Sequence, residues 1–339
     1  MNRTVLAIAC CLLSAEAHAA PGDDIYARPA LMAPARDGAR LNLVCLGTGS
    51  PTVVFDAGFS DWAPAWAVVQ PRIAAFTRAC SYDRAGSGFS GPGPRPRTTE
   101  RIATELHDAL RSGHIGGPYI LVGSAFGGDH IRAFADLFPS DVAGLVFVDA
   151  DASDVDTPAN RANDDKSNLA FVPRLKQCRD EIAKGNITFS LPPPPGRPPR
   201  MCAQAFFRGL PESQWSSQLN AKLLDLTQHK VELWDAIISE MEQVANDETW
   251  LQQHRRTLGR TPVRVLTSGN HAVGHLDRAP PPTIEHLKYE YDSALAQSRW
   301  LTLSTDSKQI FVPKSSEYIQ FDAPDAVVNA VREIVGKRR

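Results

Sequence analysis

Apolar runs of strand length alternate with stretches of helical period along most of the chain. A strand places apolar residues at every second position or in a short buried run, whereas a helix repeats them every three or four residues. The predicted strands cover residues 39–46, 52–55, 80–82, 119–123, 143–148, 263–266 and 309–312. The predicted helices cover residues 98–110, 126–138, 283–299 and 323–335. This alternation predicts an α/β fold with a mostly parallel sheet and helices on both faces.

The alternation stops between residues 151 and 260. This segment has no clear strand, and its stretch 213–244 carries apolar residues at helical spacing. A proline cluster at 192–199 indicates a rigid loop or an extended spacer. We therefore predict an α/β core of residues 20–150 and 261–339, with residues 151–260 inserted as a helical cap.

The N-terminus has the pattern of a secretory signal peptide. Arg3 precedes an apolar run at 5–13, and the sequence Ala-His-Ala at 17–19 fits an A-x-A cleavage site. The apolar run is too short to span a membrane. We predict that residues 1–19 are removed and that the mature protein is exported, to the periplasm or the extracellular space, without a membrane span.

Charge and cysteine content limit the classes of partner and site that the protein can have. The formal net charge is −2 and the basic residues are dispersed, so nucleic acid is not an expected partner. Of six cysteines, two lie in the predicted signal peptide. The others are Cys45, Cys80, Cys178 and Cys202.

An even number of cysteines in an exported protein favours disulfides. Cys178 and Cys202 bracket the proline cluster and would close a local ring. Cys45 and Cys80 lie on predicted strands and would pair if those strands are neighbours. No C-x-x-C spacing occurs, so a four-cysteine zinc site is not expected.

The turn at 123–128 has the context of a nucleophile elbow, because it joins a predicted strand to a predicted helix. The signature of that elbow is G-x-S-x-G. Gly123 and Gly127 keep the frame, but its middle residue is Ala125. A methyl group cannot attack a carbonyl carbon.

Together with four other motifs, this turn resembles the α/β-hydrolase superfamily, in particular its exported bacterial lipase- and esterase-like branch. The five motifs lie at 53–58, 81–90, 121–128, 144–150 and 318–324. The resemblance implies an α/β-hydrolase fold with a sheet of the eight-stranded type, ester hydrolysis by a Ser–acid–His triad, and no cofactor. Ala125 then stands at the nucleophile position and Glu317 at the histidine position. Asp129 replaces a residue that is usually apolar.

The resemblance also places the other parts of the site. The triad acid maps to Asp149, which we prefer, or to Asp277. Asp149 could equally be a hydrogen-bonded carboxylate at the end of a strand. The oxyanion hole maps to the backbone N–H groups of Phe59 and Phe126, which Ala125 leaves intact. Ser124 offers a neighbouring hydroxyl, but we expect it to point away from the pocket.

Losing a triad serine or histidine costs about a millionfold in turnover. We therefore expect a pseudoenzyme that binds an apolar small molecule such as an ester, lactone or ketone. One alternative is a lyase, an isomerase or a non-standard hydrolase with Glu317 as general base. Another is an inactivated carboxylic-ester hydrolase. A metal site of His271, His275 and Glu317 is disfavoured, and no metal or cofactor is expected.

Overall fold

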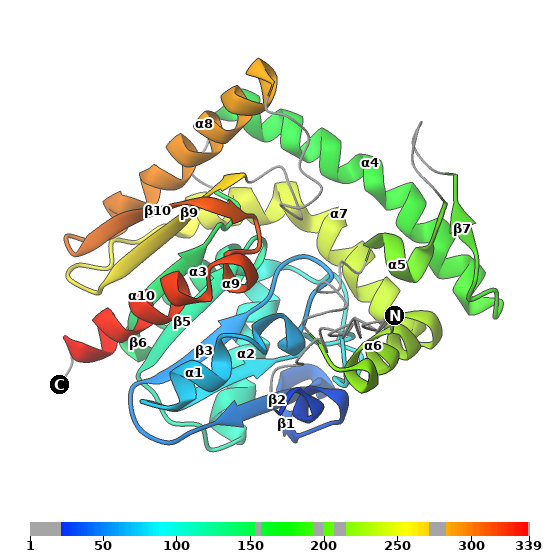
Figure 1. Ribbon diagram of the computed structural model, residues 1–339, viewed down its shortest axis with the longest axis horizontal. Helices are drawn as coiled ribbons and strands as arrows, with labels where there is room; N and C mark the ends of the chain where they lie inside the picture. The colour runs from blue at the N-terminus through cyan, green and yellow to red at the C-terminus, as the bar shows by residue number, and fades with distance from the viewer. Residues whose placement is uncertain (1–21, 153–156, 193–198, 207–214, 271–282, 338–339) are drawn as a thin grey trace, which may run out of the picture.

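The computed structural model describes residues 22–152, 157–192, 199–206, 215–270 and 283–337. Its centre is a sheet of eight strands in the order β1-β2-β4-β3-β5-β6-β9-β10 (Figure 1). The strands are β1 (Leu31–Pro34), β2 (Arg40–Leu46), β3 (Thr52–Asp56), β4 (Ala79–Tyr82), β5 (Tyr119–Ser124), β6 (Val142–Val148), β9 (Val263–Asn270) and β10 (Ser307–Ser316). β2 is antiparallel to both its neighbours, and the pairs from β4 to β10 are parallel. The predicted α/β fold is thus confirmed.

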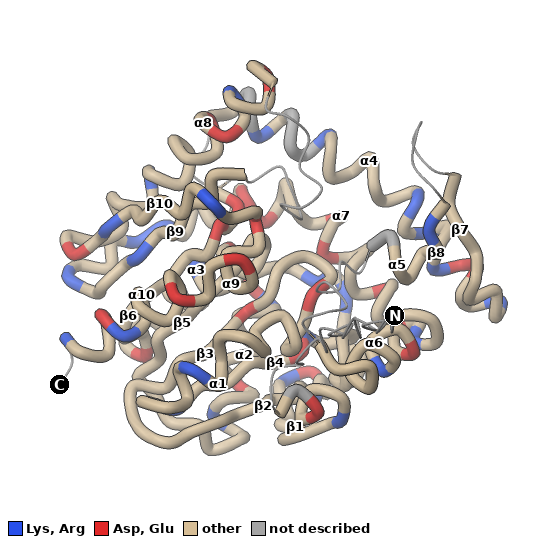
Figure 2. Tube along the Cα trace, in the orientation of Figure 1, with Lys and Arg blue, Asp and Glu red and all other residues tan. Residues whose placement is uncertain are grey.

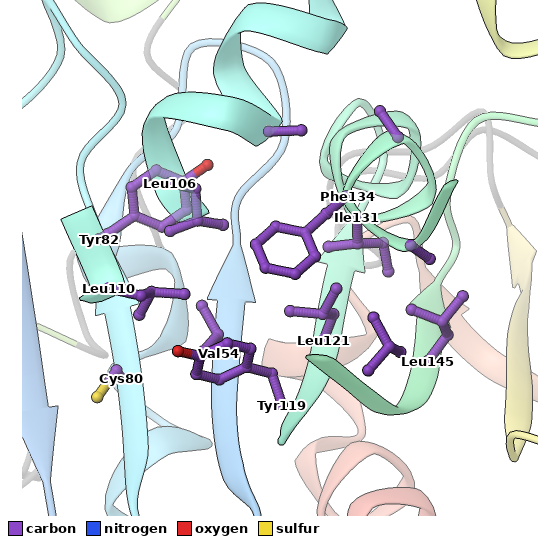
Figure 3. Close-up of a cluster of buried hydrophobic side chains, with 14 of the residues drawn as sticks. Val54, Cys80, Tyr82, Leu106, Leu110, Tyr119, Leu121, Ile131, Phe134 and Leu145 are labelled. Carbon is purple, nitrogen blue, oxygen red and sulfur yellow. The ribbon is translucent and has the colours of Figure 1, made fainter. Parts of the chain in front are cut away.

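Helices cover both faces of this sheet because the buried strands are apolar on both sides. One face packs against α2 (Thr99–Ser112) and α3 (Gly127–Leu137), where Leu106 and Phe134 lie over Val54 and Leu121 (Figure 3). The other face packs against α1 (Gln70–Ala74) and α10 (Pro324–Gly336). α8 (Ile284–Ser298) follows β9, and the short α9 (Ile319–Asp322) follows β10.

The segment between β6 and β9 is mainly helical. It contains α4 (Pro158–Ala183), α5 (Cys202–Phe206), α6 (Ser217–His229) and α7 (Val231–His254), which we call the helical segment. That this segment forms a cap separate from the core stays a prediction.

Two details of the helical segment differ from the sequence analysis. Lys230 breaks the single helix expected at 213–244 into α6 and α7. A small hairpin, β7 (Ser190–Leu191) with β8 (Arg200–Met201), flanks the proline cluster.

The strand β1 was also not predicted. It has four residues, of which Ala33 is the buried one, so it is too short to show an alternating pattern.

Two cysteine pairs lie at disulfide distance. Cys45 and Cys80 face each other across β2 and β4, with their sulfur atoms 2.10 Å apart. Cys178 of α4 and Cys202 of α5 have sulfur atoms 1.94 Å apart. These are the two pairings that the sequence suggested, and they are compatible with an exported protein. Within the described part of the chain, no helix combines the length and apolar character that a membrane crossing needs.

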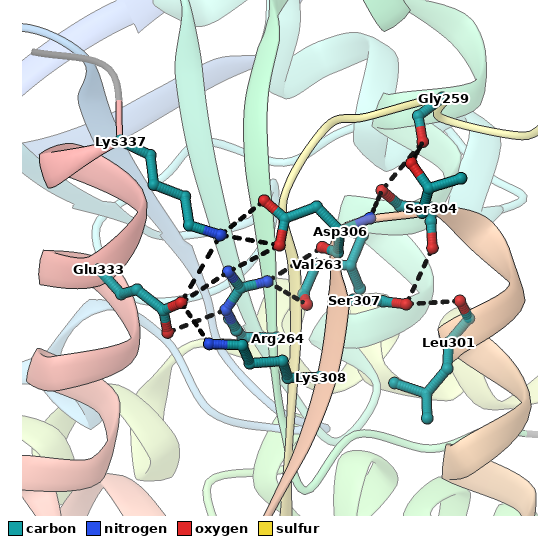
Figure 4. A network of polar contacts seen from close by, with 11 residues as sticks. Gly259, Val263, Arg264, Leu301, Ser304, Asp306, Ser307, Lys308, Glu333 and Lys337 are labelled. Carbon is teal, nitrogen blue, oxygen red and sulfur yellow. Dashed lines mark hydrogen bonds and ion pairs between the residues drawn. The ribbon is translucent and has the colours of Figure 1, made fainter.

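Charged residues are spread along the chain without a long run of one sign (Figure 2). One network surrounds the buried Arg264 near the amino end of β9 (Figure 4), opposite the carboxyl ends of the strands, where the elbow lies. There Arg264 donates to Asp306 and Glu333, each at 3.0 Å, and Lys308 and Lys337 complete the cluster. Hydrogen bonding to Arg264 lowers the pKa of Glu333 to about 2. This network ties β9 to α10, so we assign it a structural role.

Candidate functional site

The elbow has the backbone of a strained strand-to-helix turn. β5 ends at Ser124, α3 begins at Gly127, and Ala125 between them has φ 45°. A residue with a side chain rarely adopts this left-handed conformation, and the cost is about 1–3 kcal/mol. A Cβ on Gly127 would lie 2.4 Å from the carbonyl oxygen of Asp56, so only glycine allows α3 to start this close to β3. The structure therefore contains the turn, with a methyl group at its apex.

That methyl group faces the loop after β3. A Cβ on Gly58 would lie 3.3 Å from the Cβ of Ala125. The next residue, Phe59, has its ring centroid 5.4 Å from that of Phe126, with the two rings tilted by 48°. Among the described residues, no acceptor receives the backbone N–H of Phe59 or of Phe126. Phe126 follows Ala125 directly at the N-terminus of α3, where the helix dipole is favourable for an anion. The role of the two N–H groups as an oxyanion hole stays a prediction.

The same two aromatic residues join the elbow to the helical segment. Phe59 and Phe126 pack against an apolar cluster that includes Leu233, Trp234 and Ile237 of α7. The surroundings of the apex on this side are consequently apolar, which suits an apolar ligand.

Asp149 is held by several donors. Its Oδ1 accepts from the backbone N–H of Ser268 and from Nε2 of Gln297, each at 3.0 Å, and its Oδ2 accepts from the Ser268 hydroxyl at 2.6 Å. The carboxylate is 1 % exposed and follows β6 directly. These contacts match the strand-end role, and its role as triad acid stays a prediction. Asp277, the alternative, lies outside the described residues, as do His271 and His275.

Glu317 follows β10 and is half-buried. The turn before it is fixed because Asp322 accepts from both the backbone N–H and the hydroxyl of Ser316, at 2.8 and 2.6 Å. β5, β6 and β10 point the same way, so Ala125, Asp149 and Glu317 all follow the carboxyl ends of sheet strands. Ser124 is the last residue of β5 and is 4 % exposed.

A buried arginine that the sequence analysis did not select organises the loop after β3. Arg84 donates from Nη1 to Asp56 Oδ1 at 2.9 Å and to the carbonyl of Ala57 at 2.7 Å. It donates from Nη2 to the carbonyl of Gly58 at 2.8 Å and from Nε to Glu240 Oε1 at 3.3 Å. Arg84 lies in the quoted motif 81–90, but nothing in the sequence pointed to its partner on α7. The arginine thus fixes the backbone just before Phe59.

The electrostatics follow from this arrangement. Burial alone would raise the pKa of Asp56, but the nearby His130 and Arg84 hold it below its ordinary value. His130 Nδ1 lies 3.2 Å from Asp56 Oδ1, so it belongs to the same buried network.

Beside the elbow lies a small cavity, about the size of a water molecule, which we call the acidic cavity. Its lining residues come from the start of α2, the start of α3 and the middle of α7. They are Arg97, Thr99, Phe126, Asp129, His130, Glu240, Val244 and Asp247. Burial raises the pKa of Asp247 to about 6. In the part of the chain that the structure describes, no group of three His, Cys, Asp or Glu side chains is arranged to hold a metal ion.

The sequence similarity to known proteins extends over only part of the chain. The uncharacterized protein YqjL of Bacillus subtilis is 31% identical over 107 residues, which is 30% of this chain and 41% of YqjL. An AB hydrolase superfamily protein of Gibberella zeae is 30% identical over 104 residues, which is 30% of this chain and 32% of that protein. The chain thus spans less than half of these relatives.

Solved structures match nearly the whole chain. A thermophilic esterase from Thermogutta terrifontis, in a malate-bound structure, has a TM-score of 0.58 at 21% identity, covering 91% of this chain and 97% of the esterase. Cfl2 of Burkholderia cenocepacia has a TM-score of 0.61 at 18% identity, covering 89% and 94%. At such identities the likeness concerns the fold alone.

The sequence profile of the alpha/beta hydrolase family matches residues 43–330, which is most of the chain. This range includes the elbow, the helical segment and the turn that carries Glu317. With the sheet order and the glycine-framed turn after β5, the match establishes the identity of the fold. The chain belongs to the α/β-hydrolase family.

Proposed function

We propose that this protein is an exported, non-hydrolytic member of its family that binds an apolar small molecule containing a carbonyl group, such as an ester, lactone or ketone. The observation that carries this proposal is Ala125, which occupies the apex of an otherwise complete elbow at φ 45°. A hydrolase of this kind needs an oxygen nucleophile there, and the methyl group supplies none. Glu317, at the position expected for the histidine base, removes the second partner.

The binding part of the site is better preserved than the reacting part. The N–H groups of Phe59 and Phe126 can donate to a carbonyl oxygen, and they do not depend on the side chain at 125. Their rings and the apolar cluster of α7 offer an apolar wall for the rest of the ligand. An oxyanion hole and substrate binding alone raise the hydrolysis rate only about a thousand- to ten-thousandfold over the rate in water. Stable binding without turnover is therefore the expected result.

The direct test incubates the purified protein with a panel of p-nitrophenyl esters. Binding is followed by calorimetry with non-chromogenic esters, lactones and ketones of the same chain lengths. We expect saturable binding of at least one carbonyl compound and no release of p-nitrophenol above that of heat-denatured protein. Clear release of p-nitrophenol would refute the non-hydrolytic assignment.

A second candidate is supported by the place of Glu317. It is half-buried and follows a strand whose carboxyl end lies at the same edge of the sheet as the elbow. There its carboxylate would act as a general base that removes a proton next to a ligand carbonyl, while the two N–H groups stabilise the enolate. Deuterium exchange from solvent into bound ketones or lactones tests this role. Exchange that is equally fast in Glu317→Gln would eliminate it.

A further inference from the structure

One carboxylate oxygen in the acidic cavity is a buried acceptor without a partner. The side chain of Glu240 is 2 % exposed. Its Oε1 accepts from Arg84, whereas its Oε2 has no hydrogen-bond partner among the described residues. Glu240 lines the cavity, and a buried carboxylate oxygen without a donor is strongly unfavourable. The cavity therefore suits a group that donates hydrogen bonds.

The charges around the cavity specify which kind of donor. The guanidinium of Arg97 already holds Glu105 through two hydrogen bonds of 2.7 Å. Arg84 is shared between Glu240 and Asp56. Asp129 and Asp247 add two more carboxyl groups to the lining. The surroundings are thus rich in buried carboxylates, so a cationic donor fits better than a neutral one.

We propose that the acidic cavity binds the protonated primary amine of a ligand whose carbonyl lies at the elbow. An ammonium group is about as large as a water molecule and carries three N–H donors. Phe126 links the two places, since it lines the cavity and directly follows Ala125. Asp129, in the first turn of α3, also lines the cavity. This inference rests on the proposed function, because it names the ligand class of that site.

The test compares two series of methyl esters by calorimetry with the full chain. One series ends in an ammonium group, with one to five methylene groups before the carbonyl. The other has a methyl group in place of the ammonium. At the best chain length we expect the ammonium ester to bind at least about tenfold more tightly, as befits a charge-assisted hydrogen bond in a buried site.

Variants tie that preference to the cavity. Glu240→Gln should abolish it, and Asp129→Asn provides a second variant should loss of the Arg84 partner disturb folding. The matched control is Glu242→Gln, two residues along α7, where the side chain is 39 % exposed and pairs with Lys176. The control should keep the full preference. A preference that survives both Glu240→Gln and Asp129→Asn would overturn the proposal.

Other outcomes separate this inference from the function on which it rests. Equal affinity of the two series would refute the ammonium pocket while leaving the carbonyl site standing. Tight binding of simple alkylammonium ions, equal to that of the amino esters, would support the pocket and refute the carbonyl site. Displacement of the amino ester by millimolar K⁺ or Mg²⁺, but not by methylammonium, would assign the cavity to a metal ion and overturn the proposal.

Discussion

Arg84 Nε lies 3.3 Å from Glu240 Oε1, and this ion pair joins the loop after β4 to helix α7 in the interior of the protein. Both side chains are 2 % exposed. Because the same guanidinium holds the carbonyls of Ala57 and Gly58, the position of the Phe59 N–H depends on a contact made by the helical segment. The proposed binding site is therefore coupled to the packing of α7.

Replacing Arg84 should be strongly destabilising. Arg84→Met leaves the carboxylates of Asp56 and Glu240 buried without their cation, and we expect a loss of about 3–5 kcal/mol in the free energy of unfolding. Urea denaturation followed by circular dichroism measures this loss. The control is Arg95→Met, because Arg95 is 62 % exposed and lies 3.9 Å from Asp235. It should change stability by less than about 0.5 kcal/mol. Equal losses in the two variants would contradict the role of Arg84.

Removing the backbone strain at Ala125 should stabilise the protein. Ala125 has φ 45°, and glycine adopts this conformation without a steric penalty. We expect Ala125→Gly to raise the free energy of unfolding by about 0.5–1 kcal/mol. Ala135→Gly, in the buried interior of α3, should lower it by about 1 kcal/mol. Thermal denaturation of both variants checks the opposite signs, and destabilisation by Ala125→Gly would show that the turn is not strained at this residue.

Two substitutions should restore hydrolysis. In Ala125→Ser combined with Glu317→His, the serine can attack a carbonyl, the histidine can accept its proton, and the N–H groups of Phe59 and Phe126 can stabilise the oxyanion. Each single variant should stay near background, because nucleophile and base act as a unit. Initial rates with p-nitrophenyl butyrate test this. A double variant no faster than either single one would mean that the two positions do not cooperate in this protein.

Stability should depend on pH through Asp247. Burial raises the pKa of this carboxyl group from 3.8 to about 6. The folded protein therefore binds this proton more tightly than the unfolded chain does. The resulting stability is complete below about pH 3.8 and is lost as the pH rises through about 6. Asp247→Asn should remove this dependence. Its free energy of unfolding relative to that of the natural protein should therefore rise by about 1–2 kcal/mol between pH 4 and pH 8.

Denaturation curves at the two pH values measure this difference. Asp225→Asn is a useful comparison, since hydrogen bonding to Lys222 lowers the pKa of Asp225 below 3.8. Its contribution to stability is lost only at lower pH, so the difference between Asp225→Asn and the natural protein should stay unchanged between pH 4 and pH 8. An unchanged difference between Asp247→Asn and the natural protein across this range would contradict the role of burial.

Local patterns in the sequence predicted much of the fold. The apolar run of β5 and the glycines at 123 and 127 were sufficient to place the elbow, because strand, turn and helix are neighbours in the chain. The pairing of Cys45 with Cys80 followed once their strands were adjacent. The short edge strand β1 could not be found, because four residues carry too little periodicity.

Contacts between distant residues could not be predicted. Arg84 and Glu240 are separated by 156 residues, and no local pattern connects them. The break at Lys230 also has a tertiary cause. Its ammonium donates to the carbonyls of Ser87, Gly88 and Ser90, at 3.3, 2.8 and 2.6 Å, so the residue between α6 and α7 is fixed by a loop of the core. The donors that hold Asp149 come from β9 and α8, which follow it by more than a hundred residues.

The place of the helical segment in the chain has a consequence for the order of folding. β6 and β9 are neighbours in the sheet, with Leu145 opposite Val263, yet the chain forms α4 to α7 between them. The strands up to β6 precede the helical segment in the chain, so they can pair with one another before β9 docks on β6. The exposed edge of β6 is then a site for aggregation until β9 and β10 arrive. The turn that carries Glu317 is therefore among the last parts of the sheet edge to be assembled.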